Sequence, residues 1–371
     1  MNGPHILHVT ETLRGGTASY LQEIVPPQAV ALGRDRVHLL VPGSQADELR
    51  ACAGLDVRHF DDRRSRALRV PTLAAAYLRV HAALRPDLVH VHGSFAGVAV
   101  RAAHSLAGHR SRLVYCAHGW AFDRRAPAWS CAMAASVERL LAPAADAIVC
   151  ISDHDRRSAI AHGLRPDRLV TLHNAIGPAP QPDRRIDWPE GRRRILFVGR
   201  FDRQKGVDVL VEAMRSVGDR GYAWLAGSPV VAEQTLGALP SNVGVTGWLD
   251  RVALQAYYES ADVVVVPSRW EGFGLVAVEA MRASRAVVAS RVGGLPEVVL
   301  DGVTGRLVDA ESPAALAQAL TEPDDASLRE MGRRGRSRWA ERYAMTRLDE
   351  QLRGLYAKLV DGERGRIAPS A

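Results

Sequence analysis

The sequence predicts an α/β protein built from two doubly wound domains, each with a mainly parallel sheet. Three observations support this fold class. The chain has 371 residues, which is long for one domain and sufficient for two well-buried cores. In both halves, short apolar runs alternate with helical patterns, as in open α/β sheets. Between the halves, residues 177–194 are rich in Pro, Gly and Arg and lack apolar periodicity, which is typical of a linker.

The expected strands follow from the apolar runs. In the first half they lie near residues 5–10, 37–41, 56–60, 88–92, 113–117 and 147–151. In the second half they lie near residues 195–198, 223–226, 243–246, 263–266, 286–289 and 305–308. The predicted domains are therefore residues 1–176 and 195–344. A last helical pattern, near 345–360, lies in a C-terminal segment, 345–371.

Two cations follow the first expected strand of the second half. The strand-like Ile195–Val198 leads into Gly199, then Arg200 and Lys205, before a helical pattern begins. This is not a P-loop, because the lysine precedes its second glycine. Two cations on a strand-to-helix turn can nevertheless bind a diphosphate, with Arg200 as a planar fork and Lys205 as a point charge. The same residues are equally consistent with an exposed basic loop that binds no ligand.

Two carboxylates flank a glycine-rich turn after the strand-like run Val263–Val266. Glu271 lies in the turn and Glu279 lies eight residues later, inside an expected helix. The glycines of the turn let backbone N–H groups approach a ligand, and the helix start favours phosphate. The same stretch fits the dinucleotide fingerprint G-x-G-x-x-A, but residues 268–271 separate it from the strand end. A nucleotide sugar therefore suits this turn better than NAD(P).

Taken together, the motifs resemble those of the retaining glycosyltransferases of family 4, which have the GT-B fold. The motifs are Gly-Arg-x4-Lys-Gly from Gly199, Glu-Gly-x-Gly-x4-Glu from Glu271, Gly-Gly-x-Pro-Glu from Gly293 and Asp-Gly-x-x-Gly from Asp301. The resemblance covers nearly the whole chain and is strongest in its second half. It implies two Rossmann-like domains that face each other across a cleft. The first would bind the acceptor, the second would bind the donor, and the last helix would pack back on the first.

The resemblance also implies roles for individual residues. Arg200 and Lys205 would hold the donor diphosphate, Glu279 the ribose hydroxyls, and Glu271 would face the transferred sugar. Backbone amides of Phe273, Gly274, Leu275 and Val276 would approach the distal phosphate and the sugar, while Gly247 and Leu249 would border the nucleobase. In the first half, Gly15 and Gly16 would lie beneath the phosphates and His118 over the donor sugar. The candidate catalytic residues are thus His118, Glu271, Arg200 and Lys205.

Two features of the sequence bear on metal binding. His90 and His92 share one face of an expected strand and could ligate a metal, but no third ligand is apparent, so a core or acceptor-pocket role is expected. We find no convincing D-x-D motif of the kind that metal-dependent transferases use. We therefore expect metal-independent catalysis, with no cofactor besides the nucleoside-diphosphate sugar that serves as co-substrate.

The resemblance implies transfer of a hexose, with retention of configuration, to a hydroxyl group. The expected acceptor is a glycan or a polyprenyl-diphosphate-linked glycan in cell-surface polysaccharide synthesis. Two alternatives stay open: a GT-B epimerase or hydrolase that acts on nucleotide sugars, and an inactive nucleotide-binding interaction protein. Neither the nucleobase, the sugar nor the acceptor can be read from these residues.

The distribution of charged and apolar residues predicts where in the cell the protein is located. Residues 1–180 hold 21 Lys and Arg against 15 Asp and Glu, a net of +6, whereas residues 181–371 hold 27 against 26, a net of +1. The excess concentrates in the four arginines of residues 63–69, which could face an anionic inner-membrane surface. No nucleic-acid-binding motif is recognised. With no signal peptide and no long apolar run, the expected location is cytoplasmic, including the cytoplasmic face of the inner membrane.

Overall fold

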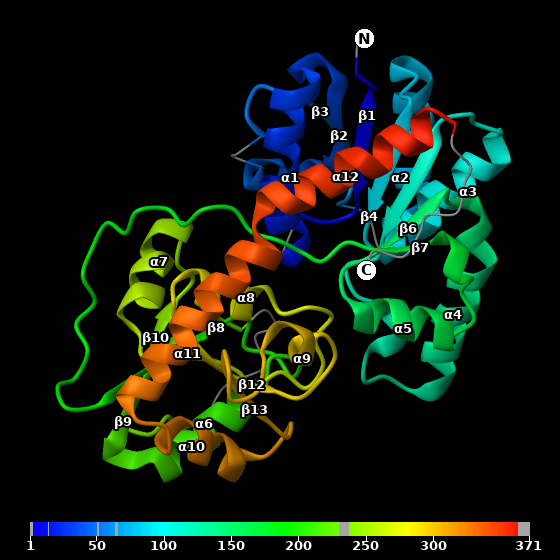
Figure 1. Ribbon diagram of the computed structural model, residues 1–371. Helices are drawn as coiled ribbons and strands as arrows, with labels where there is room; N and C mark the ends of the chain where they lie inside the picture. Colours follow the sequence, from blue (N-terminus) through cyan, green and yellow to red (C-terminus); the bar gives the residue numbers. More distant parts are fainter. Residues whose placement is uncertain (1–2, 14, 50–51, 64–65, 230–236, 363–371) are drawn as a thin grey trace. The chain divides into compact units, whose positions relative to one another are not determined.

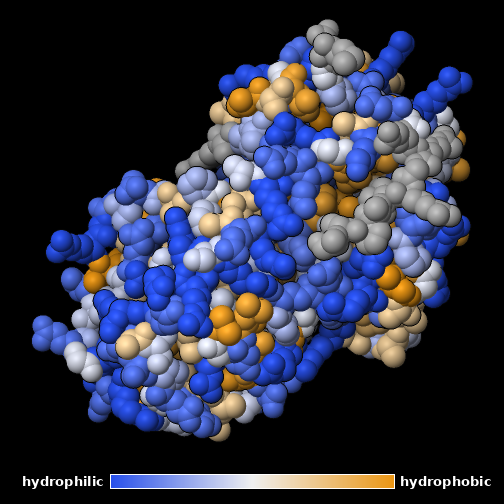
Figure 2. Space-filling view, viewed as in Figure 1, coloured by the Kyte–Doolittle hydropathy of each residue, from blue (hydrophilic) through white to orange (hydrophobic). Residues whose placement is uncertain are grey.

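The computed structural model describes residues 3–13, 15–49, 52–63, 66–229 and 237–362. The chain forms two compact units: Met1–Asn174 with Met345–Ala371, and Ala175–Ala344. Each unit is a twisted parallel sheet with helices packed against it (Figure 1). The face shown in Figure 2 is mainly hydrophilic, in keeping with a chain of which 24% is charged residues.

The sheet of the first unit has the order β3-β2-β1-β4-β5-β6-β7 in the described part of the chain, and every neighbouring pair is parallel. Apolar residues of the central strands are fully buried. Burying one large apolar side chain stabilises the folded protein by about 1.5–3 kcal/mol. The strands are β1 (Ile6–Thr10), β2 (Val37–Pro42), β3 (Asp56–Phe60), β4 (Leu88–His92), β5 (Arg112–Cys116), β6 (Ala147–Cys150) and β7 (Leu169–Thr171).

Alternation along the strands gives this sheet two different faces. Leu7 and Val9 of β1 point into an apolar core shared with α2 and α3. His8, between them, points to the other face, where its partner Gln28 comes from α1. The helix α12 packs beside α1 on that face (Figure 1). The helices are α1 (Gly16–Leu32), α2 (Arg66–Leu84), α3 (Ser94–Ala107), α4 (Ala128–Leu141), α5 (Asp153–Ala161) and α12 (Met345–Val360).

The sheet of the second unit has the order β10-β9-β8-β11-β12-β13 among the described residues, again with all pairs parallel. One face packs on α6 and α10 in a core that Leu328 and Met331 of α11 complete, while α8 contacts β11 and β12. The strands are β8 (Arg193–Val198), β9 (Gly221–Ala226), β10 (Val243–Gly247), β11 (Val263–Val266), β12 (Ala286–Ser290) and β13 (Gly305–Val308). The helices are α6 (Val207–Val217), α7 (Arg251–Ser260), α8 (Leu275–Arg282), α9 (Leu295–Val298), α10 (Pro313–Thr321) and α11 (Asp325–Arg338).

Each sheet contains a point where the winding direction reverses. In the first unit, β1 and β4 are neighbours, and the chain leaves them toward opposite edges of the sheet. In the second unit, the corresponding neighbours are β8 and β11. Ligands of open α/β sheets bind outside the carboxyl ends of the strands at such a switch point. The turns that follow these four strands are therefore the expected positions of a ligand-binding site.

All twelve predicted strands are present, and the structure adds β7. This strand has only three residues and directly follows a short helical turn that starts at Pro166, so it carries little apolar pattern. β8 begins at Arg193, two residues before the predicted start of the second domain. The strand start could not be recognised from the sequence, because Arg193 and Arg194 are charged and charged residues are rare in central strands. In the structure, Arg193 pairs with Asp325 and Arg194 pairs with Asp262.

Candidate active site

The turn after β8 carries Arg200 and Lys205. The Arg200 guanidinium lies 2.9 Å from a carboxylate oxygen of Asp202 and donates a hydrogen bond of 3.1 Å to the Gln204 amide oxygen. The Lys205 backbone N–H donates to the Asp202 carboxylate at 3.0 Å. Asp202 thus stabilises the conformation of the turn through contacts with two of its residues. The Arg200 side chain remains 41% exposed, so its outer donors are accessible to a ligand.

The turn after β11 is joined directly to this first turn. Glu271 accepts a hydrogen bond of 2.6 Å from the Lys205 ammonium group, and the two side chains are only 13% and 20% exposed. The Ser268 hydroxyl donates to the same carboxylate oxygen at 3.3 Å. A second link runs from the Gln204 side-chain amide to the backbone oxygen of Trp270, at 3.2 Å. The two sequence motifs therefore form one site.

A glycine pair allows a third loop to close on the Glu271 turn. The Gly294 N–H donates to the Glu271 backbone oxygen at 3.1 Å. A Cβ atom on Gly293 would lie 1.8 Å from that oxygen, and Gly293 has a φ of +55°. Any other residue would force the loops apart. The Gly-Gly motif thus fixes the backbone that presents the Glu271 carboxylate.

The N-terminus of α8 faces this turn. Its N-cap is Gly274, with a φ of 103°, which has no side-chain capping hydrogen bond, and no acidic residue lies in the first helical turn. Leu275 and Val276 are the first residues of the helix, so their N–H groups have no partner within it. Such a helix start favours an anion. Phe273 is 2% exposed and packs edge-on against the ring of Tyr343.

Glu279 lies further along α8 and is partly buried. Its carboxylate accepts a hydrogen bond of 2.6 Å from the hydroxyl of Tyr258, on α7. Burial, together with the neighbouring carboxylate, raises the pKa of Tyr258 well above its usual value, so the phenol stays a donor. The sequence motifs did not reveal Tyr258, because α7 contributes nothing to them. The tyrosine thereby orients the Glu279 carboxylate.

Arg269 is a further residue that sequence reasoning missed. Its guanidinium binds Asp208 through two hydrogen bonds of 2.8 and 2.7 Å and Glu311 at 2.7 Å. Its backbone N–H donates to the Gln204 backbone oxygen at 2.8 Å. Arg269 thereby fastens the start of the β11 turn to the β8 turn. Its neighbours in space are distant in sequence, so no local pattern marks it.

The residues predicted to border the nucleobase lie at the end of β10. Gly247 has a φ of 74° and accepts a backbone hydrogen bond of 2.9 Å from Gly227, which follows β9. Leu249 is half-buried and Trp248 is 63% exposed. This turn is on the carboxyl edge of the same sheet as the Arg200 and Glu271 turns.

The predicted residues of the first half lie in the first unit. Gly15 is the N-cap of α1, with a φ of 71°, and Gly16 begins the helix. A Cβ atom on Gly15 would meet nothing within 4 Å, so its backbone conformation alone favours glycine. His118 follows β5 and also has a positive φ, 57°. Burial lowers the pKa of His118 to about 4, which makes its imidazole neutral at pH 7.

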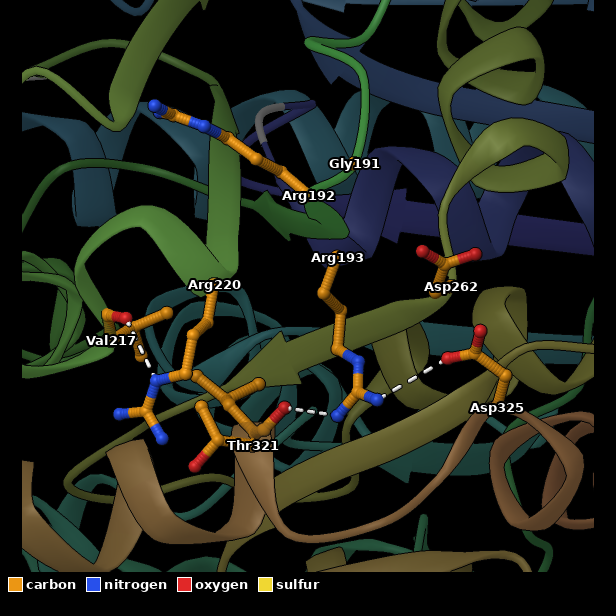
Figure 3. A pocket seen from close by; sticks show the side chains of 9 residues that line it. Gly191, Arg192, Arg193, Val217, Arg220, Asp262, Thr321 and Asp325 are labelled. Carbon is orange, nitrogen blue, oxygen red and sulfur yellow. Dashed lines mark hydrogen bonds and ion pairs between the residues drawn. The ribbon is translucent and has the colours of Figure 1, made fainter.

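A pocket at the opposite edge of the second sheet is separate from these turns. It lies by the amino ends of β8 and β11 (Figure 3). Its arginines are paired within the unit: Arg193 with Asp325 and the Leu320 backbone oxygen, and Arg220 with the Val217 backbone oxygen. These pairs are structural, and the pocket contributes nothing to the switch-point site.

One edge of the second sheet thus combines two cations, a helix N-terminus and two carboxylates. The cations and the helix start suit a diphosphate, and the carboxylates suit hydroxyl groups. This combination is typical of a site that binds a sugar carrying a phosphate group.

Comparisons with known proteins identify the family. The family described as "Glycosyl transferases group 1" matches residues 192–322, and "Glycosyl transferase 4-like domain" matches residues 15–175. An uncharacterized 41.2 kDa protein in the cps region of Klebsiella pneumoniae is 31% identical over 83% of this chain and 86% of its own length. The alpha-maltose-1-phosphate synthase of Mycolicibacterium smegmatis is 33% identical over 82% of this chain and 88% of its own length. The chain belongs to the family 4 glycosyltransferases.

Solved structures agree on the fold. Sucrose-phosphate synthase from Thermosynechococcus elongatus superposes with a TM-score of 0.81, at 22% identity, over 96% of this chain and 99% of its own. HepE from Anabaena, solved with UDP and glucose, has a TM-score of 0.77 at 21% identity, over 96% of this chain and 100% of its own. The predicted GT-B fold, with two Rossmann-like α/β domains, is confirmed.

Proposed function

We propose that this glycosyltransferase moves a hexose from a nucleoside-diphosphate sugar to an acceptor hydroxyl with retention of configuration. The observation that carries the proposal is the Lys205–Glu271 pair, 2.6 Å apart, between the two switch-point turns. In the proposed site, Lys205 binds the donor phosphate and Glu271, beside it, faces the sugar. HepE was solved with UDP-glucose as well as with UDP, which supports a donor of this kind.

In the proposed reaction, the nucleoside diphosphate leaves with developing negative charge. Arg200 and Lys205 take the diphosphate oxygens, and the N–H groups at the start of α8 face the distal phosphate. Because these groups are held in place before the reaction, they stabilise the leaving group without reorganising. This account requires no Mg²⁺ at the phosphates. Transfer should proceed equally well with and without added Mg²⁺, whereas a requirement for Mg²⁺ would contradict this part of the proposal.

The carboxylates and His118 act on hydroxyl groups and on the sugar. Glu279, oriented by Tyr258, holds the ribose hydroxyls. When the donor diphosphate engages Lys205, Glu271 faces the sugar, where it orients hydroxyls and stabilises positive charge on the ring. His118 faces the sugar as a neutral imidazole. The acceptor proton passes to the leaving phosphate oxygen as the new bond forms on the same face.

The proposed acceptor is a glycan or a polyprenyl-diphosphate-linked glycan in cell-surface polysaccharide synthesis, in line with the cps-region description of the Klebsiella relative. The names of two other similar proteins, maltose-1-phosphate synthase and sucrose-phosphate synthase, favour a second candidate, a free sugar phosphate. Incubating the enzyme and labelled donor with each acceptor class separates these candidates. Donor turnover that is equal with and without every acceptor would instead indicate a hydrolase or epimerase.

A panel of UDP, GDP and ADP, each with its sugars, tests the donor. A ligand at 100 times its dissociation constant should stabilise the protein by about 2.7 kcal/mol, which a thermal-shift assay detects. One nucleobase should stand out, and Lys205→Ala should abolish its shift. A flat response to all three nucleotides in a folded protein would contradict donor binding.

We also propose that the first unit contacts an anionic membrane surface at the cytoplasmic face. Within the described residues, no helix is both long enough and apolar enough to cross a bilayer. Trp129, Met133 and Leu140 are 70%, 57% and 78% exposed on one stripe of α4, with exposed Arg124 and Arg125 just before the helix. An apolar stripe with flanking cations suits a lipid headgroup layer.

The predicted basic cluster, residues 63–69, is a second candidate for this surface. Arg63 and Arg69 are exposed, whereas Arg64 lies outside the described residues. Co-sedimentation with phosphatidylglycerol vesicles tests both surfaces. Replacing Trp129 and Met133 with Ser should lower binding, and neutralising the four arginines of the cluster should lower it in a salt-dependent way. Leu106→Ser, an exposed single site on α3, is the control. No vesicle binding at low salt would contradict the proposal.

A further inference from the structure

Three histidines meet on one face of the first sheet, at its switch point. His8 lies on β1 and His90 and His92 lie on β4. The strands are neighbours, with His8 opposite His90, so all three side chains point to the face that α1 and α12 cover. None is more than 1% exposed. The sequence shows no third ligand for His90 and His92, but strand pairing supplies His8. The expected core position of His90 and His92 is confirmed.

Each imidazole has one ring nitrogen held by a neighbour outside the cluster. His8 Nε2 lies 2.8 Å from the Gln28 amide oxygen, and His90 Nδ1 lies 2.6 Å from the Tyr356 hydroxyl. His92 Nδ1 lies 3.1 Å from Nε2 of His118. The nitrogens left over are His8 Nδ1, His90 Nε2 and His92 Nε2. The first and last of these are 3.1 Å apart, and the three residues offer ligand atoms that all lie within 4.8 Å of one another.

Hydrogen bonds alone do not satisfy this cluster. One proton can bridge His8 Nδ1 and His92 Nε2, but His90 Nε2 is then left buried, with no hydrogen-bond partner among the described residues. A buried polar atom without a partner is costly and rare in native proteins. A positive ion in the middle of the three nitrogens would satisfy them all at once.

We propose that the first unit binds one divalent transition-metal ion, with zinc the best fit, through His8 Nδ1, His90 Nε2 and His92 Nε2. Three imidazoles and no carboxylate suit zinc or cobalt better than magnesium or calcium. In a tetrahedral site with bonds of about 2.0–2.1 Å, ligand nitrogens are about 3.3 Å apart, close to the observed His8–His92 separation. A fourth position is left for water.

The surrounding residues match what metal-bound histidines require. Such histidines almost always donate their second ring N–H to an outer partner, which fixes the ring and raises its basicity. Gln28, Tyr356 and His118 supply these partners here.

The metal would also position His118. A His92 that ligates through Nε2 must carry its proton on Nδ1 and donate it to His118 Nε2. His118 then holds its own proton on Nδ1. Without the metal, the bridge from His92 Nε2 to His8 leaves His92 Nδ1 as an acceptor, and the His118 proton moves to Nε2. This consequence for catalysis rests on the proposed function of His118, but the metal site itself does not.

Metal content tests the site without any donor or acceptor. The full chain is purified without chelators through a tag that contains no histidine, and its metals are measured by mass spectrometry. We expect about one zinc per chain, and cobalt substitution should give tetrahedral ligand-field bands. His90→Gln should lower occupancy at least tenfold, and Tyr356→Phe should weaken metal affinity about 10–100-fold. His104→Gln, in a separate buried histidine group of the same unit, is the matched control.

The same measurements can also show that the metal site does not exist. If the wild-type chain contains no transition metal and binds no added zinc or cobalt while remaining folded, the proposal is wrong and the cluster is a hydrogen-bonded histidine chain. Nitrogen NMR of labelled histidine would then find His118 protonated at Nε2. Equal metal content in the wild type, His90→Gln and His104→Gln would likewise overturn the assignment. Donor binding in the second unit would survive either result.

Discussion

The ammonium nitrogen of Lys205 lies 2.6 Å from Oε2 of Glu271, which ties the turn after β8 to the turn after β11. The pair is mostly buried, so water screens it weakly. A donor phosphate would compete with Glu271 for the lysine. Donor binding would therefore release the carboxylate toward the sugar at the moment when it is needed there.

Removing either cation of the site should cripple donor use. Truncating one partner of a buried charge pair typically costs about 2–5 kcal/mol, so Lys205→Ala should lower kcat/KM by roughly 30-fold or more. Arg200→Ala should have a similar direction of effect. Arg192→Ala, which removes a surface pair with the 91% exposed Asp219, is the control and should be near normal. If Lys205→Ala shows normal turnover and a native circular dichroism spectrum, Lys205 does not take part in donor binding.

The two carboxylates should give separable defects. Glu279→Gln should mainly weaken nucleotide binding, because its work is at the ribose, and Tyr258→Phe should do so more mildly. Glu271→Gln should leave nucleotide affinity nearly intact and lower kcat, because its work is at the sugar. Calorimetry with the nucleoside diphosphate and steady-state kinetics measure the two effects. Identical defects in both variants would mean that the carboxylates act as one unit.

A buried ion pair in the first unit should matter for stability and not for donor binding. Arg101 lies 2.7 Å from Glu138, and their side chains are 0% and 4% exposed. Tyr115 donates to the other oxygen of Glu138 at 2.9 Å. Arg101→Ala would leave a buried carboxylate unpaired, which typically costs about 3–5 kcal/mol. Chemical denaturation should show this loss, and the paired variant Arg101→Met with Glu138→Leu should recover most of it.

The Asp208–Arg269 pair should make stability depend on acid pH. Its hydrogen bonds to Arg269 lower the pKa of Asp208 below its usual value of 3.8. A lowered folded-state pKa means that the stabilisation is fully present above the unfolded value and is lost as the pH falls through the folded value. The Tm difference between the wild type and Asp208→Asn should therefore be constant above about pH 5 and shrink below pH 4. A difference independent of pH would show that the carboxylate charge contributes nothing.

Much of the fold could be predicted because its signals are local. Buried parallel strands are nearly continuous apolar runs, and all twelve predicted runs became strands. β7 escaped notice because its three residues are too few to show a pattern. The amino end of β8 was hidden because its arginines look like linker residues until their partners Asp262 and Asp325 are known.

The site could be predicted only where its residues share a turn. Arg200 with Lys205, and Glu271 with the start of α8, are sequence neighbours, and the switch-point rule suggests that the two turns meet. Tyr258 and Arg269 depend on packing between distant elements, so no motif marks them. His8 meets His90 only through the register of β1 against β4, which a single sequence does not specify.

The anomeric configuration of the product tests most directly whether the switch-point site transfers a sugar from a nucleoside-diphosphate donor with retention. Proton NMR can follow the enzyme with its best donor in the first minutes of reaction, with the preferred acceptor or with water in its place. With a retaining mechanism at this site, an α-linked donor should give an α-configured product first, and Lys205→Ala should give almost none. A β-configured first product would contradict the retaining mechanism, and an undiminished rate in Lys205→Ala would contradict the site.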